Sequence, residues 1–401
     1  MFLLCNSSLK SMKIITRTVW VLSLVSFFTD IASEMLYPIM PVYLKSIGFS
    51  IVLIGVLEGF AEATAGLSKG YFGNLSDNIG KRLPFVQIGY ALSAISKPMM
   101  AVLVFPIGIF FARALDRLGK GIRTGARDAL LSDEATPETK ARVFGFHRSM
   151  DTMGAVLGPL IALTYLTFHP ADYKTLFLIA FLPGLLAISA TVFIKEKKKL
   201  QFLTKPRTGF LDFIKYWKTS PTTYKRLIVG LLIFTLFNSS DVFLILKMKN
   251  AGYNDTIVIG TYIFYNLVYA AFSYPLGILA DKMGMNKILV VGFLLFAMTY
   301  IGMAYAESQF VFIFLFFLYG VYAAATEGIA KAWITNVCEK NKTATAIGTF
   351  TAFQSIATLI ASSAAGLIWF TFGASATFLL SGIVAVLVAI YISRIHYTLA
   401  A

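Results

Sequence analysis

The sequence predicts an all-helical membrane protein whose transmembrane helices form two halves of six, and three observations lead to this prediction. Hydrophobic residues make up 57% of the 401 residues, charged residues make up 14%, and the mean hydropathy is +0.74. A soluble domain has about a quarter of its residues charged. Apolar runs of about twenty residues, long enough for a helix to cross a bilayer, recur along the chain. A long polar stretch near the middle divides these runs into two equal sets.

The apolar runs define the expected spans. A transmembrane barrel is excluded because its strands alternate polar and apolar residues, whereas these runs are unbroken. We expect twelve spans, near residues 17–44, 52–73, 84–104, 106–130, 143–167, 175–194, 226–246, 256–278, 287–305, 310–335, 344–368 and 374–393. The expected domains are an N-terminal half over 1–194, a cytoplasmic linker over 195–225 and a C-terminal half over 226–401.

The basic residues predict the orientation in the membrane. If both termini are cytoplasmic, the cytoplasmic segments carry several times more Lys and Arg than the outer loops, as the positive-inside rule requires. The net charge of +15 is then mostly an insertion signal that suits anionic lipid, and nucleic acid is not expected as a partner. We expect a multi-pass protein of the cell inner membrane. The chain start offers no cleaved signal sequence, and Met12 is as good a start as Met1.

The linker contains an expected amphipathic helix. Phe210, Phe213, Ile214 and Trp217 fall at helical spacing among lysines. This pattern is typical of a helix that lies on a membrane surface.

The fourth span carries charges at mid-membrane depth. Counted from Phe105 at 1.5 Å per residue, Arg113 lies roughly 12 Å and Arg117 roughly 18 Å into a core about 30 Å thick. If Arg113, Arg117 and Lys120 faced lipid, the cost would be about 8 to 10 kcal/mol. They must therefore face protein or water. Gly121 and Gly125 form a GxxxG pair for close helix packing.

Carboxylates of the same half are the candidate partners of these cations. They are Asp30 and Glu34 on the first span, Glu58 and Glu62 on the second, Asp116 and Asp128 on the fourth, and Asp151 on the fifth. We predict a central cavity in which Asp30, Glu34, Glu58, Glu62 and Asp116 take part in proton coupling, because a nearby Arg and desolvation push a carboxyl pKa in opposite directions. The alternative is a static set of buried ion pairs. For Arg123, Arg127 and Asp128 we expect only the cytoplasmic end of the helix.

A loop motif repeats in the two halves. "GNLSDNIGKR" at 73–82 follows the second span, and "GILADKMGMNK" at 277–287 follows the eighth, 204 residues later. Parallel six-span repeats are typical of secondary transporters. We predict a conformational latch built on Gly73, Asp77, Gly80, Lys81, Arg82 and Asp281. The aspartates near a helix start make charge contacts that can form in one state and open in another.

These residues resemble the loop signature of the major facilitator superfamily, and the resemblance covers essentially the whole chain. It implies the major facilitator fold. The second copy departs from the signature because Met285 and Asn286 precede Lys287. The strings "FFTDIASEMLYPIMPVYL" and "DRLGKGIRTGARDALLSDEA" are similar to a subgroup of bacterial and archaeal permeases with no agreed substrate. Arg113 matches the family's arginine in span 4, whereas Arg117 stands where a glycine is expected.

The fifth span resembles the glycine pattern of the superfamily's antiporters. Gly145, Gly154, Gly158 and Pro159 match it, but the terminal glycine pair is Ala162 and Leu163 here. The partial match implies export over import. Ordinary helix packing is the alternative.

The C-terminal half is poorer in charge and rich in aromatic residues. The predicted substrate-binding residues of the whole chain are Arg113, Arg117, Lys120, Tyr37, Asn238, Asn266 and Gln354. Glu327 and Lys331 are expected to pair within one helix. Phosphate-loop, HExxH and CxxC motifs are absent from the sequence, so we expect no enzyme, no cofactor and no metal.

The sequence therefore predicts a secondary active transporter with alternating access. We expect a proton-coupled exporter, an antiporter, of a small amphiphilic or anionic organic molecule, acting as a monomer. Uptake of an organic anion such as a carboxylate, coupled to protons, is one alternative. A membrane receptor that does not transport is an alternative from another class.

Overall fold

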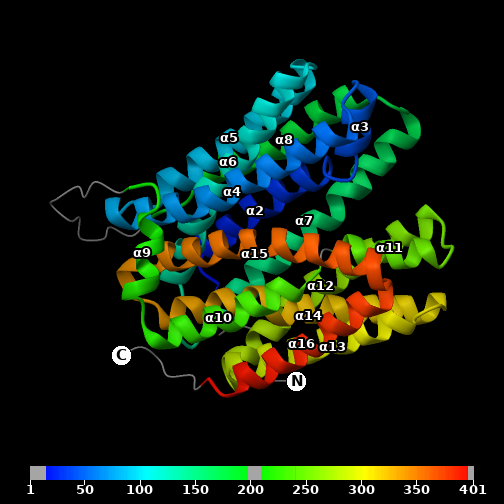
Figure 1. Cartoon of the computed structure of the whole chain (residues 1–401). Helices are drawn as coiled ribbons and strands as arrows, with labels where there is room; N and C mark the ends of the chain where they lie inside the picture. Colours follow the sequence, from blue (N-terminus) through cyan, green and yellow to red (C-terminus); the bar gives the residue numbers. More distant parts are fainter. Residues whose placement is uncertain (1–14, 197–208, 240, 396–401) are drawn as a thin grey trace, which may run out of the picture. The chain divides into compact units, whose positions relative to one another are not determined.

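The computed structural model describes residues 15–196, 209–239 and 241–395. Within these residues every regular element is helical (Figure 1). The Met12 start and Cys5 lie outside the described residues, as does the side chain of Glu58. Each predicted span falls on one helix or on two consecutive helices, so the all-helical prediction is confirmed.

The chain divides into two compact units. Unit 1 comprises 1–136, 150–219 and 340–352, and unit 2 comprises 137–149, 220–339 and 353–401. The helices wholly inside unit 1 are α2 (Arg17–Glu34), α3 (Met40–Ser46), α4 (Ile51–Ile79), α5 (Leu83–Val102), α6 (Pro106–Asp133), α8 (Tyr173–Thr191) and α9 (Asp212–Thr219). Those wholly inside unit 2 are α10 (Thr222–Phe237), α11 (Val242–Asn250), α12 (Asp255–Met283), α13 (Met285–Tyr305), α14 (Gln309–Val337) and α16 (Ala374–Ser393).

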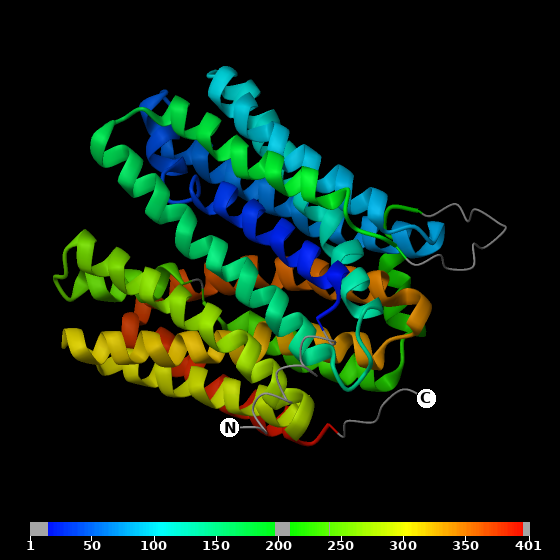
Figure 2. The same cartoon turned by 180° about the vertical axis from the view of Figure 1, so that it is seen from behind.

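Two helices contribute to both units. They are α7 (Lys140–Phe168) and α15 (Thr343–Phe372), which follows the short 3-10 turn Lys340–Lys342. Figure 2 shows α7 as one long continuous helix. The first turns of α7 belong to unit 2 and the first turns of α15 to unit 1. The fifth helix of each sequence half therefore starts in the unit formed mainly by the other half.

Length and composition support membrane insertion. In the described residues, eight helices are long and apolar enough to cross a membrane. The first four predicted spans fall outside that set; among them, α4 and α6 carry several charged side chains. Charges of this kind are tolerated in a bilayer only where they face protein or water.

The first span of each half is broken. The first break separates α2 from α3 between Glu34 and Met40, and the second separates α10 from α11 between Phe237 and Val242. Pro38 and Pro41 accompany the first break, where the missing proline N–H groups disfavour a continuous helix. With the repeat offset of 204 residues, the two breaks hold equivalent positions.

The linker helix α9 packs on unit 1. Phe213 is 2% exposed, and a Cβ atom at Gly70 of α4 would lie 2.6 Å from its ring. The Phe213 carbonyl accepts a hydrogen bond from Thr349 Oγ1 at 3.1 Å. Phe210 and Ile214 are exposed. The helix is amphipathic as expected, and part of its apolar face covers protein.

Candidate functional site

Close packing on one side of α6 fixes where its charged side chains point. The helix begins with Pro106 in its first turn, after Phe105 in extended conformation. A Cβ atom at Gly119 would lie 2.5 Å from the Gly89 carbonyl oxygen of α5. A Cβ atom at Gly125 would lie 3.1 Å from the backbone of α4. Both neighbouring helices therefore approach α6 at its glycines, and the bulky charged residues occupy the remaining surface.

Most charged side chains of α6 are buried, whereas Lys120 is exposed. Arg113, Asp116 and Arg117 are 5%, 6% and 8% exposed. The inner charges Arg123, Arg127 and Asp128, expected only as the cytoplasmic end of the helix, are also buried. The guanidinium of Arg123 lies over the Tyr90 ring at 4.5 Å from its centroid.

Asp116 is the centre of a dense set of contacts. Its Oδ1 lies 2.6 Å from Lys97 Nζ and accepts a hydrogen bond from Ser93 Oγ at 2.5 Å. Its Oδ2 lies 3.6 Å from Arg113 Nη1. Lys97 lies on α5 and is 2% exposed. These contacts favour a fixed anion that joins α5 to α6.

Arg117 has fewer of its hydrogen-bonding groups paired than Asp116 has. Its Nη1 lies 3.2 Å from Glu62 Oε1 of α4. Its Nε is buried and has no hydrogen-bond partner among the described residues. A buried donor without a partner costs about 1 to 3 kcal/mol. Arg117 thus retains capacity to bind an anion.

A small polar cavity of about 30 Å³ lies beside these charges. Its lining comes from α2 and the residues after it, α5 and α6, all in unit 1: Asp30, Ser33, Glu34, Tyr37, Ser93, Arg113, Asp116, Arg117, Lys120 and Arg123. The structure thereby brings together seven of the predicted site residues, Asp30, Glu34, Tyr37, Arg113, Asp116, Arg117 and Lys120. The cavity has room for about two water molecules.

A second buried network lies nearby in unit 1. Arg127 pairs with Asp128 at 2.9 Å and donates to Ser26 Oγ at 3.0 Å. Ser26 Oγ in turn donates to Asp151 Oδ1 of α7 at 2.7 Å. Ser26 was not predicted, because a lone serine in an apolar span gives no signal in the sequence.

The two loop motifs have the same geometry. Asp77 Oδ2 accepts hydrogen bonds from the Thr345 N–H at 2.7 Å and from Thr345 Oγ1 at 2.9 Å, at the start of α15. Asp281 accepts from the N–H groups of Ala141 at 3.0 Å and Arg142 at 3.1 Å, at the start of α7. Each aspartate therefore caps a helix whose first N–H groups have no partner within the helix.

The other residues of the first motif, around Asp77, each make different contacts. Arg82 Nη2 lies 3.0 Å from Asp77 Oδ1, and Arg82 also pairs with Asp133. Gly80 ends α4 in the left-handed region with φ of 71°. Lys81 is exposed.

Glycines of the motifs allow backbone contact. A Cβ atom at Gly73 would lie 2.5 Å from the Ala344 carbonyl oxygen, and one at Gly277 would lie 2.5 Å from the Ala141 carbonyl oxygen. Gly145 of α7 packs the same way on Ser273 of α12. The starts of α7 and α15 are thus held by backbone contact as well as by the aspartates.

The other glycines of α7 pack on α2. Added Cβ atoms at Gly154 and Gly158 would lie 2.5 Å from the Phe27 carbonyl oxygen and 2.7 Å from the Met35 nitrogen. Pro159 follows within the helix. These glycines bring α7 next to the helix that carries Asp30.

The predicted polar residues of the C-terminal half are scattered. Asn238 ends α10 and donates to Tyr322 Oη at 3.3 Å. Asn266 donates to the Tyr262 carbonyl of its own helix, and Gln354 is half-buried.

Glu327 pairs with a residue of another helix. Its carboxylate contacts Arg148 of α7, which also donates to Tyr269 Oη. The sequence predicted a pair with Lys331, on the same helix. The contact with Arg148, on another helix, was not predicted.

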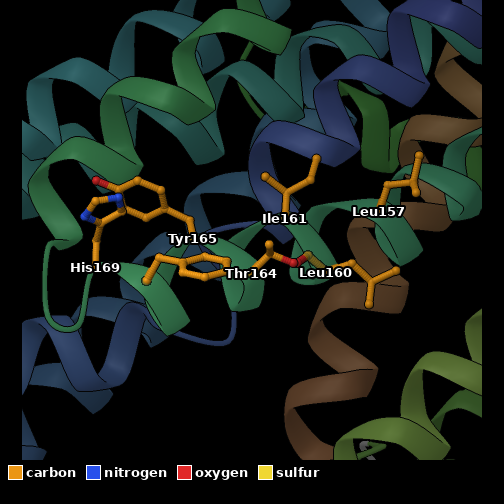
Figure 3. Close-up of a pocket in the computed structure, with 7 residues that line it drawn as sticks. Leu157, Leu160, Ile161, Thr164, Tyr165 and His169 are labelled. Atoms are coloured by element: carbon orange, nitrogen blue, oxygen red, sulfur yellow. The ribbon is translucent and has the colours of Figure 1, made fainter.

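A larger hollow on unit 1 is apolar. Figure 3 shows its lining, which comes from α7 and the residue after it: Leu157, Leu160, Ile161, Thr164, Tyr165, Phe168 and His169. The Tyr165 hydroxyl donates to Asp172 Oδ2 at 2.8 Å, and chiefly this bond lowers the pKa of Asp172 in the loop before α8. Because its lining has no carboxylate, lysine or arginine, this hollow adds no charge to the candidate site.

Two compact helical units, a repeated helix-capping motif and a charged cavity define the class of multi-pass secondary transporters. The model of the Major Facilitator Superfamily matches residues 22–265 and 250–398. The chain belongs to the Major Facilitator Superfamily, whose members are transporters of small molecules and not enzymes.

Relatives and solved structures agree with this membership. The chain is 34% identical over 379 residues to an uncharacterized MFS-type transporter of Methanocaldococcus jannaschii, covering 93% of each chain. It is 26% identical over 143 residues to the quinolone resistance protein NorA of Staphylococcus aureus, covering 36% of this chain and 37% of that one. The fold is similar to that of the human organic anion transporter MFSD10, with a TM-score of 0.81, 15% identity and coverage of 94% and 99%. It is also similar to the transporter FucP, with a TM-score of 0.78, 11% identity and coverage of 96% and 100%.

Proposed function

We propose that this transporter exports a small amphiphilic or anionic organic molecule in exchange for protons. The observation that carries the proposal is the buried Nε of Arg117, a cationic donor without a hydrogen-bond partner among the described residues, in a side chain that lines a polar cavity. Arginine presents a planar set of donors that suits carboxylate, sulfonate and phosphate groups. An anionic group of the substrate satisfies this donor.

Asp30 and Glu34 are the proposed coupling carboxylates. They lie one turn apart on α2 and line the same cavity as Arg117 and Lys120. An amphiphilic substrate binds Arg117 with its anionic group and an ionised carboxylate with a hydrogen-bond donor, and protonation of that carboxylate removes the acceptor charge. Substrate and protons then compete for Asp30 and Glu34, and exchange of substrate for protons follows from this competition. Glu62 shares Arg117 and belongs to the same proposal, whereas Asp116 is proposed to position Lys97 and Arg113.

Two observations favour export over uptake. The glycines Gly154 and Gly158 pack α7 tightly on α2, as an interface that prevents leakage through an exchanger requires. The local similarity to NorA, a quinolone resistance protein, points in the same direction. Uptake of an organic carboxylate, with Arg113 and Arg117 as direct ligands, is the second candidate because it uses the same cations.

The test uses the purified full chain in sealed vesicles with an acidic interior and an internal pH dye. Aromatic carboxylates and sulfonates are added outside, and the expected result is release of protons from the interior with substrate accumulation. Movement of substrate and protons in the same direction overturns exchange and favours uptake. Absence of flux for the whole panel overturns transport of such anions and favours a receptor.

Matched variants test which residues bind the substrate and which carry the protons. Arg117→Gln is expected to weaken substrate binding, while Arg226→Gln, which removes an exposed arginine of unit 2, is expected to leave it unchanged. Asp30→Asn is expected to abolish proton movement with folding intact. An unchanged pH response in Asp30→Asn removes this residue from the mechanism.

A further inference from the structure

The break between α10 and α11 places a carboxylate, Asp241, at the start of a helix. Helical hydrogen bonding ends at Asn238, whose φ and ψ of −85° and 103° are extended, and Asp241 begins α11. Interrupted spans at corresponding positions of two repeats are the best pointer in a transporter sequence to a ligand site. The break in the first half lies next to the charged cavity of unit 1, which leaves the break in unit 2 without an assigned ligand.

The Asp241 carboxylate has no cationic partner within the described part of the chain. Its Oδ1 accepts a hydrogen bond from Tyr319 Oη at 2.7 Å, and it forms no ion pair with a described lysine or arginine. Asp116, Asp281 and Glu327, in contrast, each pair with a basic residue. A carboxylate within a membrane-spanning region is costly unless a cation or a proton neutralises it.

Tyr319, the hydrogen-bond partner of Asp241, belongs to a cluster of aromatic rings. The ring centroid of Tyr319 lies 5.0 Å from that of Tyr265, 5.2 Å from that of Tyr322 and 6.2 Å from that of Tyr300. Phe296 stacks on Tyr300 at 3.9 Å. Rings grouped around one carboxylate recognise organic ammonium groups, because the ring faces carry negative charge density.

We propose that Asp241 and the tyrosines around it bind an organic cation, such as an alkyl or aryl ammonium group. A metal cation is disfavoured because it needs several converging oxygens, and Asp241 Oδ1 already accepts a hydrogen bond from Tyr319 Oη. Tyr300 Oη lies 3.4 Å from Asn238 Oδ1 and 3.3 Å from the Ser239 carbonyl oxygen, and its single hydrogen can be donated to one of them. An ammonium group needs only one carboxylate oxygen and ring faces.

This inference extends the proposed function by adding a second ligand class, and it rests on that function only for the entry of ligands into the protein. All the residues that carry it belong to unit 2, so it does not depend on the anion site of unit 1. Binding is measured without a proton gradient. Failure of the cation site and failure of proton exchange are therefore distinguishable.

The test uses the purified full chain in detergent and a pair of probes of matched shape. Phenyltrimethylammonium is the cation, and tert-butylbenzene is its uncharged isostere. Calorimetry and the ligand-dependent shift in Tm are expected to show binding of the cation and much weaker binding of the isostere. Equal binding of both probes, or no binding of the cation at millimolar concentration, overturns the proposal.

Variants locate the site. Asp241→Asn is expected to weaken cation binding roughly tenfold or more, while Asp241→Glu retains it. Tyr319→Leu is expected to weaken it and Tyr319→Phe, which keeps the ring, to leave most of it. Glu307→Gln removes an exposed carboxylate of the same unit and serves as the charge control. If Asp241→Asn does not fold, the Tyr319 pair decides the question, and unchanged binding in Tyr319→Leu overturns the proposal.

Discussion

Asp77 and Thr345, which are 268 positions apart in the chain, are joined by two hydrogen bonds at the start of α15. One bond satisfies a helix N–H group and the other a side-chain hydroxyl. The negative carboxylate also lies at the positive end of the helix dipole. The aspartate of the loop motif therefore acts mainly as a helix cap, and its pairing with Arg82 holds it in place.

Removal of the charge at this cap is expected to slow transport. Asp77→Asn keeps an acceptor oxygen but loses the interaction of a full charge with the helix terminus, about 1 kcal/mol, so we expect the initial rate to fall roughly fivefold. Asp281→Asn is expected to act similarly, because it caps α7 in the same way. Initial rates in vesicles check this, with Glu307→Gln as control. Rates equal to that of the unchanged protein contradict the latch.

The backbone contacts at the motif glycines predict a second effect. Gly73→Ala places a methyl group 2.5 Å from the Ala344 carbonyl oxygen, so α4 and α15 must move apart, at a cost of about 1 to 3 kcal/mol. Gly59→Ala, in the same helix, has open space and is the matched control. The Tm in detergent is expected to fall for Gly73→Ala alone. An equal change in both variants assigns the effect to helix propensity.

The buried pair of Lys97 and Asp116 predicts strong coupling between two substitutions. Lys97→Met removes the nearer cation of the buried Asp116 carboxylate and leaves it the Arg113 contact at 3.6 Å, so we expect a loss of about 3 kcal/mol in stability. The double variant Lys97→Met with Asp116→Leu is expected to lose less stability than Lys97→Met alone. Chemical unfolding of the four proteins of this cycle measures the coupling, and Lys174→Met, at an exposed lysine, is the control. Additive losses contradict a direct pair.

The cap of α8 predicts a pH dependence. Asp172 accepts from Tyr165 Oη and from the Thr175 N–H, and these bonds lower its pKa below the ordinary 3.8. A lowered pKa in the folded protein means that the charged form contributes stability above about pH 4 and loses it as the pH falls further. The Tm difference between the unchanged protein and Asp172→Asn should therefore narrow below about pH 4. A constant difference from pH 3 to 6 excludes this contribution.

Much of the fold is predictable because membrane insertion requires long apolar runs. The spans at 84–104 and 374–393, for example, coincide closely with α5 and α16. The break between α10 and α11 was not predicted, because averaging over about twenty residues hides a few extended residues. Pro38 was a local signal for the first break, but no proline stands between Asn238 and Asp241.

The site was predictable only in part. Depth along α6 indicated that Arg113 and Arg117 are buried, and periodicity placed Asp30 and Glu34 on one face. The choice of partner was not predictable, because it depends on which helices pack together. Lys97 pairs with Asp116 since α5 and α6 approach at Gly89 and Gly119, a contact that no single helix pattern reveals.

The exchange of helix starts between the units has a consequence for biosynthesis. Residues 340–352 complete unit 1, although the ribosome makes them long after α2 to α8. Until then Asp77 has no helix terminus to cap, and Gly73 lacks its contact with the Ala344 carbonyl. The first six spans can insert early, but their unit reaches its final form only when the eleventh span is made. Separately expressed halves are therefore expected to be functional only as a complemented pair.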